Sequence, residues 1–232
     1  MQLAIGNKNY SSWSMRPWVL MRELGMAFEE INIRFDSFDA DSQFKQQLTH
    51  LGAATGKVPL LIDDSAKHNG RSLLVYDSLA ITERLFEHNA RVWPSDTAMR
   101  ALARSACAEM HSSFGQLRSL CPMNIEADLA DQGALLWRDN AGLRADVARL
   151  ERLWADLMGT GKGPMLCGAF SAVDAFFAPV VMRINSYALP VSKTAQAYCE
   201  RVTQLSSVQA WIDGALAEQD FLDFEEPYRF KP

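Results

Sequence analysis

Residues 9–17 of the chain are Asn9-Tyr10-Ser11-Ser12-Trp13-Ser14-Met15-Arg16-Pro17. They join a short apolar segment, residues 3–5, to a segment with a helical pattern, residues 16–24. Ser14 is a suitable N-cap for that helix, and Pro17 fits its first turn because the missing N–H would have had no partner there. The free N–H groups and partial positive charge of such a helix end favour a bound anion. The stretch therefore predicts serine hydroxyls beside an anion-binding helix end.

The first 88 residues alternate between strand and helix patterns. Strands are expected at residues 3–5, 28–35, 60–62 and 72–75, and helices at 16–24, 42–51 and 79–86, with Ser78 as the cap of the last helix. Residues 63–71 are expected to form a polar hairpin, with Asn69-Gly70 as its turn. The predicted order is strand, helix, strand, helix, strand, strand, helix, or βαβαββα.

From residue 96 onward the patterns are helical. Trp93-Pro94-Ser95-Asp96 has the character of a linker followed by a helix cap. Ser171 and Asp174 have the spacing of a capping box, which would open an apolar helix over residues 175–184. Leu143, Val147, Leu150, Trp154 and Leu157 recur at the spacing of one helix face. The sequence predicts an α/β domain at residues 1–88, a linker at 89–95 and an all-α domain at 96–232.

The bulk composition argues against several kinds of partner. The chain has 232 residues, of which 48% are hydrophobic, with a formal net charge of -5. An acidic chain without runs of Lys or Arg is poorly suited to nucleic acid or anionic lipid. No apolar stretch approaches the ~18 residues of a membrane span, and no leader segment opens the chain, so we expect a cytoplasmic protein with no membrane partner.

The four cysteines are expected to be reduced, buried thiols. Cys107, Cys121, Cys167 and Cys199 are far apart and form no metal-ligand spacing with one another or with a histidine. We expect no metal cofactor.

Ser11 and Ser12 have no histidine nearby in sequence to act as a base, so neither is expected to be a nucleophile. A serine hydroxyl can instead donate a hydrogen bond to a thiolate. A thiol with a pKa of about 8.5 is only about 3% ionised at pH 7, so stabilising the thiolate would matter. The alternative is that these serines only cap the helix.

Two further short motifs can bind an extended, charged peptide. Val58-Pro59 follows a glycine-containing loop at the start of a strand, where a cis proline would leave the backbone of Val58 able to pair with a peptide; an ordinary trans proline is the alternative. Asp77-Ser78 precedes a helix, where the hydroxyl and N–H can hold a carboxylate and Asp77 an ammonium, as in an α-amino acid. A plain helix cap is the alternative there.

Together these features resemble the glutathione S-transferase family over essentially the whole chain. They are the thioredoxin-like βαβαββα order, Val58-Pro59, Asp77-Ser78, the capping box and the helical second domain. The run Ser11 to Arg16 is similar to the Ser-Ser-Cys-Ser-x-Arg motif of the zeta class, and closer to a bacterial group with Ser-Ser-Trp-Ser-x-Arg-Pro-Trp.

The resemblance implies a glutathione site and a homodimer. Ser11, with Ser12 as the neighbouring candidate, would stabilise the thiolate of glutathione, which is a co-substrate here. Val58 would pair with the cysteinyl backbone beside a cis Pro59, and Asp77 and Ser78 would hold the γ-glutamyl head. Lys57 would reach a glutathione carboxylate, and Gln43 would add a further contact.

The second substrate, a small electrophile, would bind between the domains. We expect it beside Trp13 and along a long helix that carries Met110, Phe114 and Arg118; the alternative is that Met110 and Phe114 belong to the interdomain core. The Ser11 position carries no cysteine, which argues against mixed-disulfide chemistry. The arginine of the zeta isomerases is replaced by Ser186, with Arg183 one turn earlier, which argues against that isomerase activity.

Three functions fit these residues. The first is glutathione conjugation in detoxification, and the second is a non-catalytic transferase-like module for protein contacts. The third is a glutathione-dependent isomerase or peroxidase. A non-catalytic module would need no anion-stabilising hydroxyl beside residues that bind a carboxylate. Glutathione conjugation is therefore favoured over the non-catalytic module.

Overall fold

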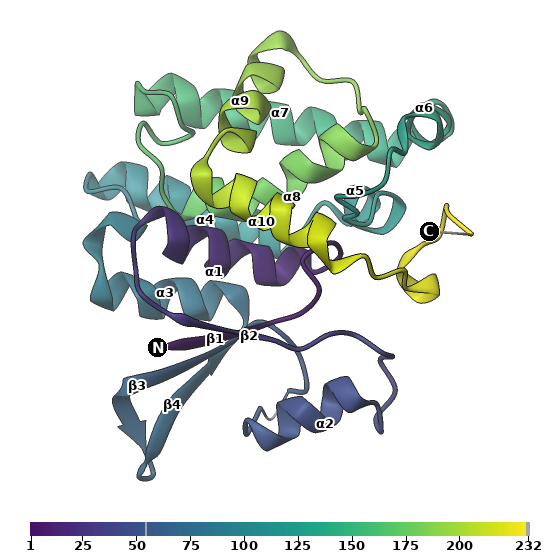
Figure 1. The fold of residues 1–232 in the computed structure, drawn as a ribbon. Coiled ribbons are helices and arrows are strands. Elements are labelled where there is room, and N and C mark those ends of the chain that lie inside the picture. The colour runs from purple at the N-terminus through teal and green to yellow at the C-terminus, as the bar shows by residue number, and fades with distance from the viewer. Residues whose placement is uncertain (54, 231–232) are drawn as a thin grey trace.

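Four strands form one mixed sheet in the N-terminal domain of the computed structural model, which describes residues 1–53 and 55–230 (Figure 1). β1 pairs in parallel with β2 and antiparallel with β3, and β3 pairs antiparallel with β4, in the order β2-β1-β3-β4. With the intervening helices this confirms the predicted βαβαββα order. The strands are β1 (Gln2–Ile5), β2 (Glu29–Asn32), β3 (Leu60–His68) and β4 (Arg71–Tyr76).

The two faces of the sheet bury different side chains because successive strand residues point to opposite sides. Leu3, Ile5 and Leu61 face α1 (Ser12–Glu23) and α3 (Ser78–His88), and beyond them the helical domain. Ala4 and Leu60 face the other way, toward α2 (Gln43–His50). The sheet is therefore covered on both sides, with the larger core on the α1 and α3 side.

The first and third helices begin differently from the prediction. Helix α1 starts at Ser12 with Ser11 as its N-cap, and Ser14 lies inside it, where its hydroxyl accepts the Gly6 N–H at 3.2 Å. In α3 the N-cap is Asp77 rather than Ser78, since its carboxylate accepts the Leu79 N–H at 2.8 Å. Ser11 lies three residues before the expected cap and Asp77 one residue before it, and both have the non-helical backbone that an N-cap requires.

The β3–β4 hairpin is longer than predicted. The strands continue through the polar residues up to the Asn69-Gly70 turn, with an irregularity in register between Asp63 and Lys67. An exposed antiparallel ribbon needs no apolar face, so polarity alone did not mark the strand ends. Both turn residues have positive φ, as the Asn-Gly pair predicted.

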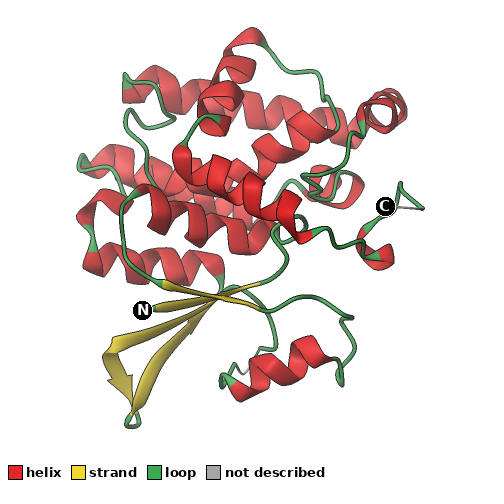
Figure 2. Ribbon diagram, viewed as in Figure 1, coloured by secondary structure: helices red, strands yellow, loops and turns green. Residues whose placement is uncertain are grey.

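The rest of the chain is helical (Figure 2). Helix α8 lies at the centre of the helical domain with nearly every side chain buried, and α1 packs against both α8 and α10. No helix among the described residues is long and apolar enough to cross a membrane. The α-helices are α4 (Thr97–Ser112), α5 (Gly115–Leu120), α6 (Ala130–Asp139), α7 (Ala141–Gly161), α8 (Ala172–Ser186), α9 (Lys193–Thr203) and α10 (Ser206–Glu218), with 3-10 turns η1 (Ala90–Val92) and η2 (Asp223–Glu225).

The predicted capping box opens α8, which begins at Ala172 rather than at residue 175. The fully buried Asp174 carboxylate accepts hydrogen bonds from the N–H groups of Ser171 and Leu166 and from the Tyr198 hydroxyl. Burial raises the pKa of Asp174 to about 6, although those three hydrogen bonds favour the ionised form. The carboxylate thus ties the start of α8 to α9.

Replacing Asp174 by alanine is expected to lower the free energy of unfolding by about 2–3 kcal/mol, because three buried donors lose their acceptor. Urea unfolding at pH 7 measures this change. Tyr198→Phe removes one of the three donors, the Tyr198 hydroxyl, and leaves the other two paired with the carboxylate. This variant should lower the free energy of unfolding by about 1 kcal/mol. A loss for Asp174→Ala no larger than that for Tyr198→Phe would contradict this role.

Candidate active site

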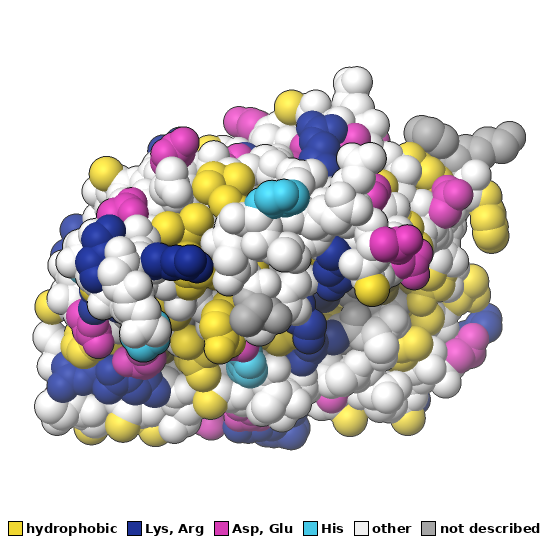
Figure 3. Space-filling view, turned by 90° about the horizontal axis from the view of Figure 1, so that it is seen from below, with side chains coloured by type: hydrophobic (Ala, Val, Ile, Leu, Met, Phe, Trp, Pro, Cys, Tyr) yellow, Lys and Arg dark blue, Asp and Glu magenta, His cyan; other side chains and the backbone are white. Residues whose placement is uncertain are grey.

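A cavity of about 1280 Å³ lies where the N-terminal domain meets α4, α5 and α8. Seen from below, this face of the molecule is hollowed, with dark blue Lys and Arg side chains beside the hollow (Figure 3). The predicted site residues that line the cavity are Ser11, Ser12, Trp13, Lys57, Val58, Pro59, Asp77, Ser78 and Arg118. Gln43, Met110 and Phe114 are not among its lining residues.

Both predicted serines are held at the N-terminal end of α1. The Ser11 and Ser14 hydroxyl oxygens are 2.7 Å apart, and the Ser12 hydroxyl accepts a hydrogen bond from Nη2 of Arg183 at 3.2 Å. A hydroxyl that accepts from a guanidinium keeps its own proton to donate. Ser12 therefore has a proton available for a ligand atom in the cavity, with a positive charge behind it.

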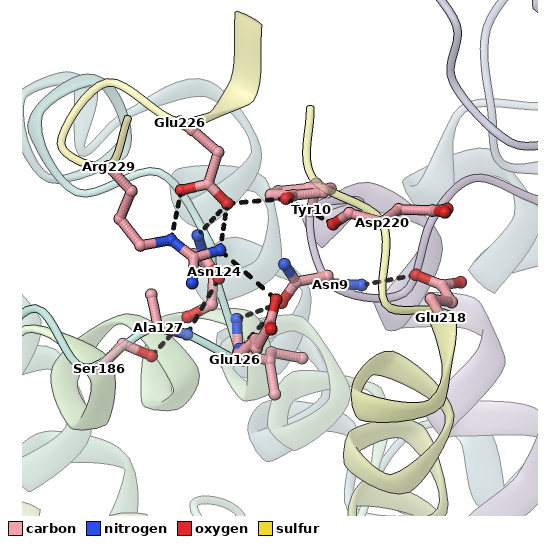
Figure 4. Close-up of polar contacts among 11 residues, drawn as sticks. Asn9, Tyr10, Asn124, Glu126, Ala127, Ser186, Glu218, Asp220, Glu226 and Arg229 are labelled. Atoms are coloured by element: carbon pink, nitrogen blue, oxygen red, sulfur yellow. Dashed lines mark hydrogen bonds and ion pairs between the residues drawn. The ribbon is translucent and has the colours of Figure 1, made fainter. Parts of the chain in front are cut away.

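Tyr10 lines the cavity, but its hydroxyl is turned to the C-terminal segment (Figure 4). It donates to Oε1 of Glu226 at 2.7 Å and lies 3.1 Å from the Asp220 carbonyl oxygen. Burial, followed by the hydrogen bond to Glu226, raises the pKa of Tyr10 well above its usual value. Tyr10 is thus an anchor for the serine loop and not an available phenol.

The residue before Tyr10 makes a second anchor to the helical domain (Figure 4). The side-chain oxygen of Asn9 accepts the N–H groups of Ile125 and Glu126 at 2.7 and 2.9 Å. At the end of α10, Glu218 accepts the N–H groups of Lys8 and Asn9. The loop that carries the serines is therefore bonded to parts of the chain more than a hundred residues away.

The Val58-Pro59 peptide bond is cis, as the resemblance implied. Lys57 precedes it in the cavity wall, and Lys45 lies nearby, donating from Nζ to the Gly56 carbonyl oxygen at 2.6 Å. The sequence pointed to Gln43 as a glutathione contact and did not point to Lys45. The two residues are two positions apart on α2, so their side chains point about 200° apart around the helix axis. Lys45 therefore lines the cavity, while Gln43 is exposed outside it.

Asp77 and Ser78 line the cavity at the start of α3, and both already have protein partners. Asp77 caps the helix through one oxygen, and its other oxygen is 3.2 Å from Nε2 of His111 on α4. The Ser78 hydroxyl accepts from Nη1 of Arg16 at 3.3 Å. The Asp77 side chain remains 46% exposed, so a ligand can still reach it.

The expected long helix carrying Met110 and Phe114 is wrong. Helix α4 ends at Ser112 and α5 begins at Gly115, because Phe114 has a left-handed backbone with φ of 57°. Met110 and Phe114 are 1% and 4% exposed and belong to the core, as the alternative interpretation held. Adjacent helix residues differ by about 100° in direction, so His111 reaches the cavity while Met110 cannot.

Trp13 lies close to two guanidinium groups. The carbon at the centre of the Arg16 guanidinium is 4.2 Å from the ring centroid of Trp13, and that of Arg118 is 4.8 Å away. His111 meets the same ring edge-on at 5.0 Å. Arg16 is the last residue of the Ser11 to Arg16 motif, so the sequence already marked it. Arg183 stands out in the sequence only as a charged residue within the apolar segment of α8.

Glu225 lines the cavity from the C-terminal segment. Burial, followed by repulsion from Glu226, raises the pKa of the Glu225 carboxyl to about 7. No sequence pattern pointed to this residue, since only the fold returns the chain end to the first loop.

The cysteines take no part in the cavity lining. All four are free and buried, as predicted, and burial raises the pKa of each thiol. Among the described residues, no group of three or more His, Cys, Asp or Glu side chains could hold a metal ion.

Comparison with known proteins identifies the fold. Residues 10–88 match the family model "Glutathione S-transferase, N-terminal domain". A glutathione transferase homologue from Burkholderia gl BGR1, solved with bound glutathione, is 24% identical with a TM-score of 0.66, covering 93% of this chain and 98% of that one. A sphingomonad glutathione S-transferase complexed with glutathione is 20% identical with a TM-score of 0.60, at coverages of 93% and 98%.

A glutathione transferase from Pseudomonas putida, with one glutathione disulfide bound per subunit, is 20% identical with a TM-score of 0.60, covering 91% of this chain and 90% of that one. No curated protein sequence matches this chain. The chain thus has the glutathione transferase fold, a thioredoxin-like domain followed by an all-helical domain, as the sequence predicted.

Replacing Glu226 by alanine is expected to free the segment after α10, because Tyr10, Asn124 and Arg229 all donate to its buried carboxylate. Local opening should become easier by about 2–3 kcal/mol, which is roughly a hundredfold faster amide exchange in residues 9–12 and 220–229. Hydrogen–deuterium exchange measures this change. The control is Glu126→Ala, whose side chain makes one exposed contact with Arg229 at 3.4 Å. Equal exchange in the two variants would contradict the anchoring role.

Proposed function

We propose that this protein is a glutathione transferase that stabilises the glutathione thiolate with serine hydroxyls for attack on small electrophiles. The observation that carries the proposal is the joint presence of Ser11, Ser12, Val58 and the Asp77-Ser78 pair around one cavity. The N-terminal family match and the glutathione-bound relatives of the same fold support it. The zeta-like character of the Ser11 to Arg16 motif is part of the proposal.

In this proposal glutathione spans the N-terminal side of the cavity. Its γ-glutamyl head meets Asp77 and Ser78, and its cysteinyl backbone pairs with Val58 beside Pro59. Its glycyl carboxylate meets Lys57, with Lys45 as a second cation nearby. Opposite charges then face each other at both ends of the peptide, which favours binding in one direction.

The thiol would lie at the N-terminal end of α1, beside Ser11 and Ser12. Hydrogen bonds to a thiolate lower its pKa, and each unit of lowering corresponds to about 1.4 kcal/mol. The contact from Arg183 to Ser12 adds a charge that strengthens the hydroxyl as a donor. The ionised sulfur then attacks an electrophilic carbon held on the helical side of the cavity.

Titration of the purified protein with glutathione, following heat and thiolate absorbance together, tests the proposal. Saturable binding with a lowered thiol pKa is the expected result. Absence of binding at millimolar glutathione would favour a non-catalytic module that uses the fold for protein contacts. Binding without conjugation of any electrophile would favour an isomerase or peroxidase. A homodimer and a cytoplasmic location remain predictions of the same proposal.

Removal of either serine hydroxyl is expected to lower turnover more than glutathione affinity. Ser11→Ala and Ser12→Ala should each reduce kcat roughly tenfold or more, because a donor to the developing thiolate is lost. The dissociation constant for glutathione should change by less than about threefold, since a neutral thiol binds weakly to either hydroxyl. Steady-state kinetics and calorimetry measure the two effects.

Ser112→Ala is the matched control, because that exposed hydroxyl donates to the Ala108 carbonyl oxygen outside the cavity. Full activity in one serine variant would assign the thiolate to the other serine. Full activity in both would refute serine activation.

Asp77→Asn is expected to weaken glutathione binding roughly tenfold while leaving kcat nearly unchanged, because asparagine keeps the helix cap but loses the charge for the ammonium. Calorimetry measures the affinity, and thermal melting checks the fold. His111→Asn removes the histidine partner of Asp77 and keeps the carboxylate. An equal loss of affinity in His111→Asn would assign the effect to the His111 contact and not to the ligand.

A further inference from the structure

Three arginines lie close together around Trp13 and the start of α1. The guanidinium groups of Arg16 and Arg118 lie 4.2 and 4.8 Å from the Trp13 ring centroid, and Arg183 donates a hydrogen bond to the neighbouring Ser12 hydroxyl. Arg118 and Arg183 line the cavity, while Arg16 lies against Trp13 and Ser78. Arg118 and Arg183 come from α5 and α8 of the helical domain, whereas Lys45 and Lys57 come from the N-terminal domain.

None of the three arginines pairs with a carboxylate in the described part of the chain. Arg183 donates to the carbonyl oxygens of Cys121 and Pro179, and Arg118 donates to that of His111. Arg16 is 2% exposed, and its Nε has no hydrogen-bond partner. Elsewhere the chain pairs buried or half-buried arginines with carboxylates, as in Arg84 with Asp63 and Arg229 with Glu226.

The arginines weaken one another's protonation. Burial, followed by the charges of Arg183 and Arg118, lowers the pKa of Arg16 to about 9. Burial, followed by the charge of Arg118, lowers the pKa of Arg183 to about 10. A group of charges without counter-ions is costly to bury, and an anion entering the cavity would relieve that cost.

The proposed binding mode of glutathione uses two of these arginines indirectly. One carboxylate goes to Lys57 and the other to Ser78, which accepts from Arg16, while Arg183 serves the thiolate through Ser12. Among the described residues, the hydrogen bonds of Arg118 go to the carbonyl oxygens of His111 and Ser113 and to neither Ser12 nor Ser78, so the proposed contacts of glutathione do not include it. Two carboxylates line the cavity, and neither is paired with these arginines in the described part of the chain. Asp77 lies beside His111, and burial raises the pKa of Glu225 to about 7.

We propose that the second substrate is an electrophile that carries a carboxylate or similar anionic group, bound by Arg118 with Arg183 behind it. Trp13 supports its apolar part, and its reacting carbon lies toward the sulfur beside Ser11 and Ser12. This inference rests on the proposed function and names the substrate class of that site. The thiolate forms the new S–C bond as the bond from carbon to the leaving group breaks, and that group departs with the electron pair.

A pair of glutathione conjugates that differ only in charge tests the inference. The probes are S-(para-carboxybenzyl)glutathione and the neutral S-(para-carbamoylbenzyl)glutathione, titrated by calorimetry beside unmodified glutathione. The carboxylate conjugate is expected to bind the unmodified protein roughly tenfold more tightly than the amide. Arg118→Gln should abolish this preference without weakening the amide conjugate, and Arg118→Lys should keep part of it.

Arg138→Gln is the matched control, since Arg138 is exposed and, in the described part of the chain, its guanidinium pairs with the neighbouring Asp139. Turnover of para-(chloromethyl)benzoate and para-(chloromethyl)benzamide, which both release chloride, gives the kinetic counterpart, with the same preference expected in kcat/KM. Equal affinity of the two conjugates in the unmodified protein, while glutathione itself binds, would overturn this inference alone. Failure of unmodified glutathione to bind would overturn the proposed function, and this inference with it.

Discussion

The hydrogen bond from Arg183 to Ser12 joins the two domains at the point where the site is built. Arg183 belongs to α8, whose other side chains are almost all buried, and Ser12 opens α1. A guanidinium at that depth can be tolerated only because carbonyl oxygens and a hydroxyl surround it. The packing of α1 on α8 therefore sets both the direction of the serine hydroxyls and the charge of the cavity.

Much of the fold could be predicted because local patterns and tertiary packing agree. The apolar residues of β1 and β3, the Asn69-Gly70 turn and the capping box at Ser171 are each a short-range signal with one physical meaning. The helix starts were less accurate. Several serines compete for the cap of α1, and the backbone hydrogen bond from Met15 to the Ser11 carbonyl oxygen places Ser14 inside the helix.

The N-terminal wall of the cavity could be predicted from the sequence better than the helical wall. Ser11, Val58 and Asp77 lie at junctions between elements, so their positions follow from the order of strands and helices. The helical wall depends on where α4 ends, which the left-handed Phe114 decides. The spacing of Ala103, Cys107 and Met110 fits the buried face of α4, but only the fold shows that His111 faces the cavity.

The network around Glu226 brings the last described part of the chain onto its first loop. During synthesis, the N-terminal domain leaves the ribosome long before residues 218–229 exist. At that stage the Tyr10 hydroxyl lacks Glu226 as its acceptor, and the Lys8 N–H lacks the Glu218 carboxylate. The serine loop therefore acquires its full set of contacts only after residues 218–229 have been synthesised, and the cavity wall that it forms is fixed at that stage.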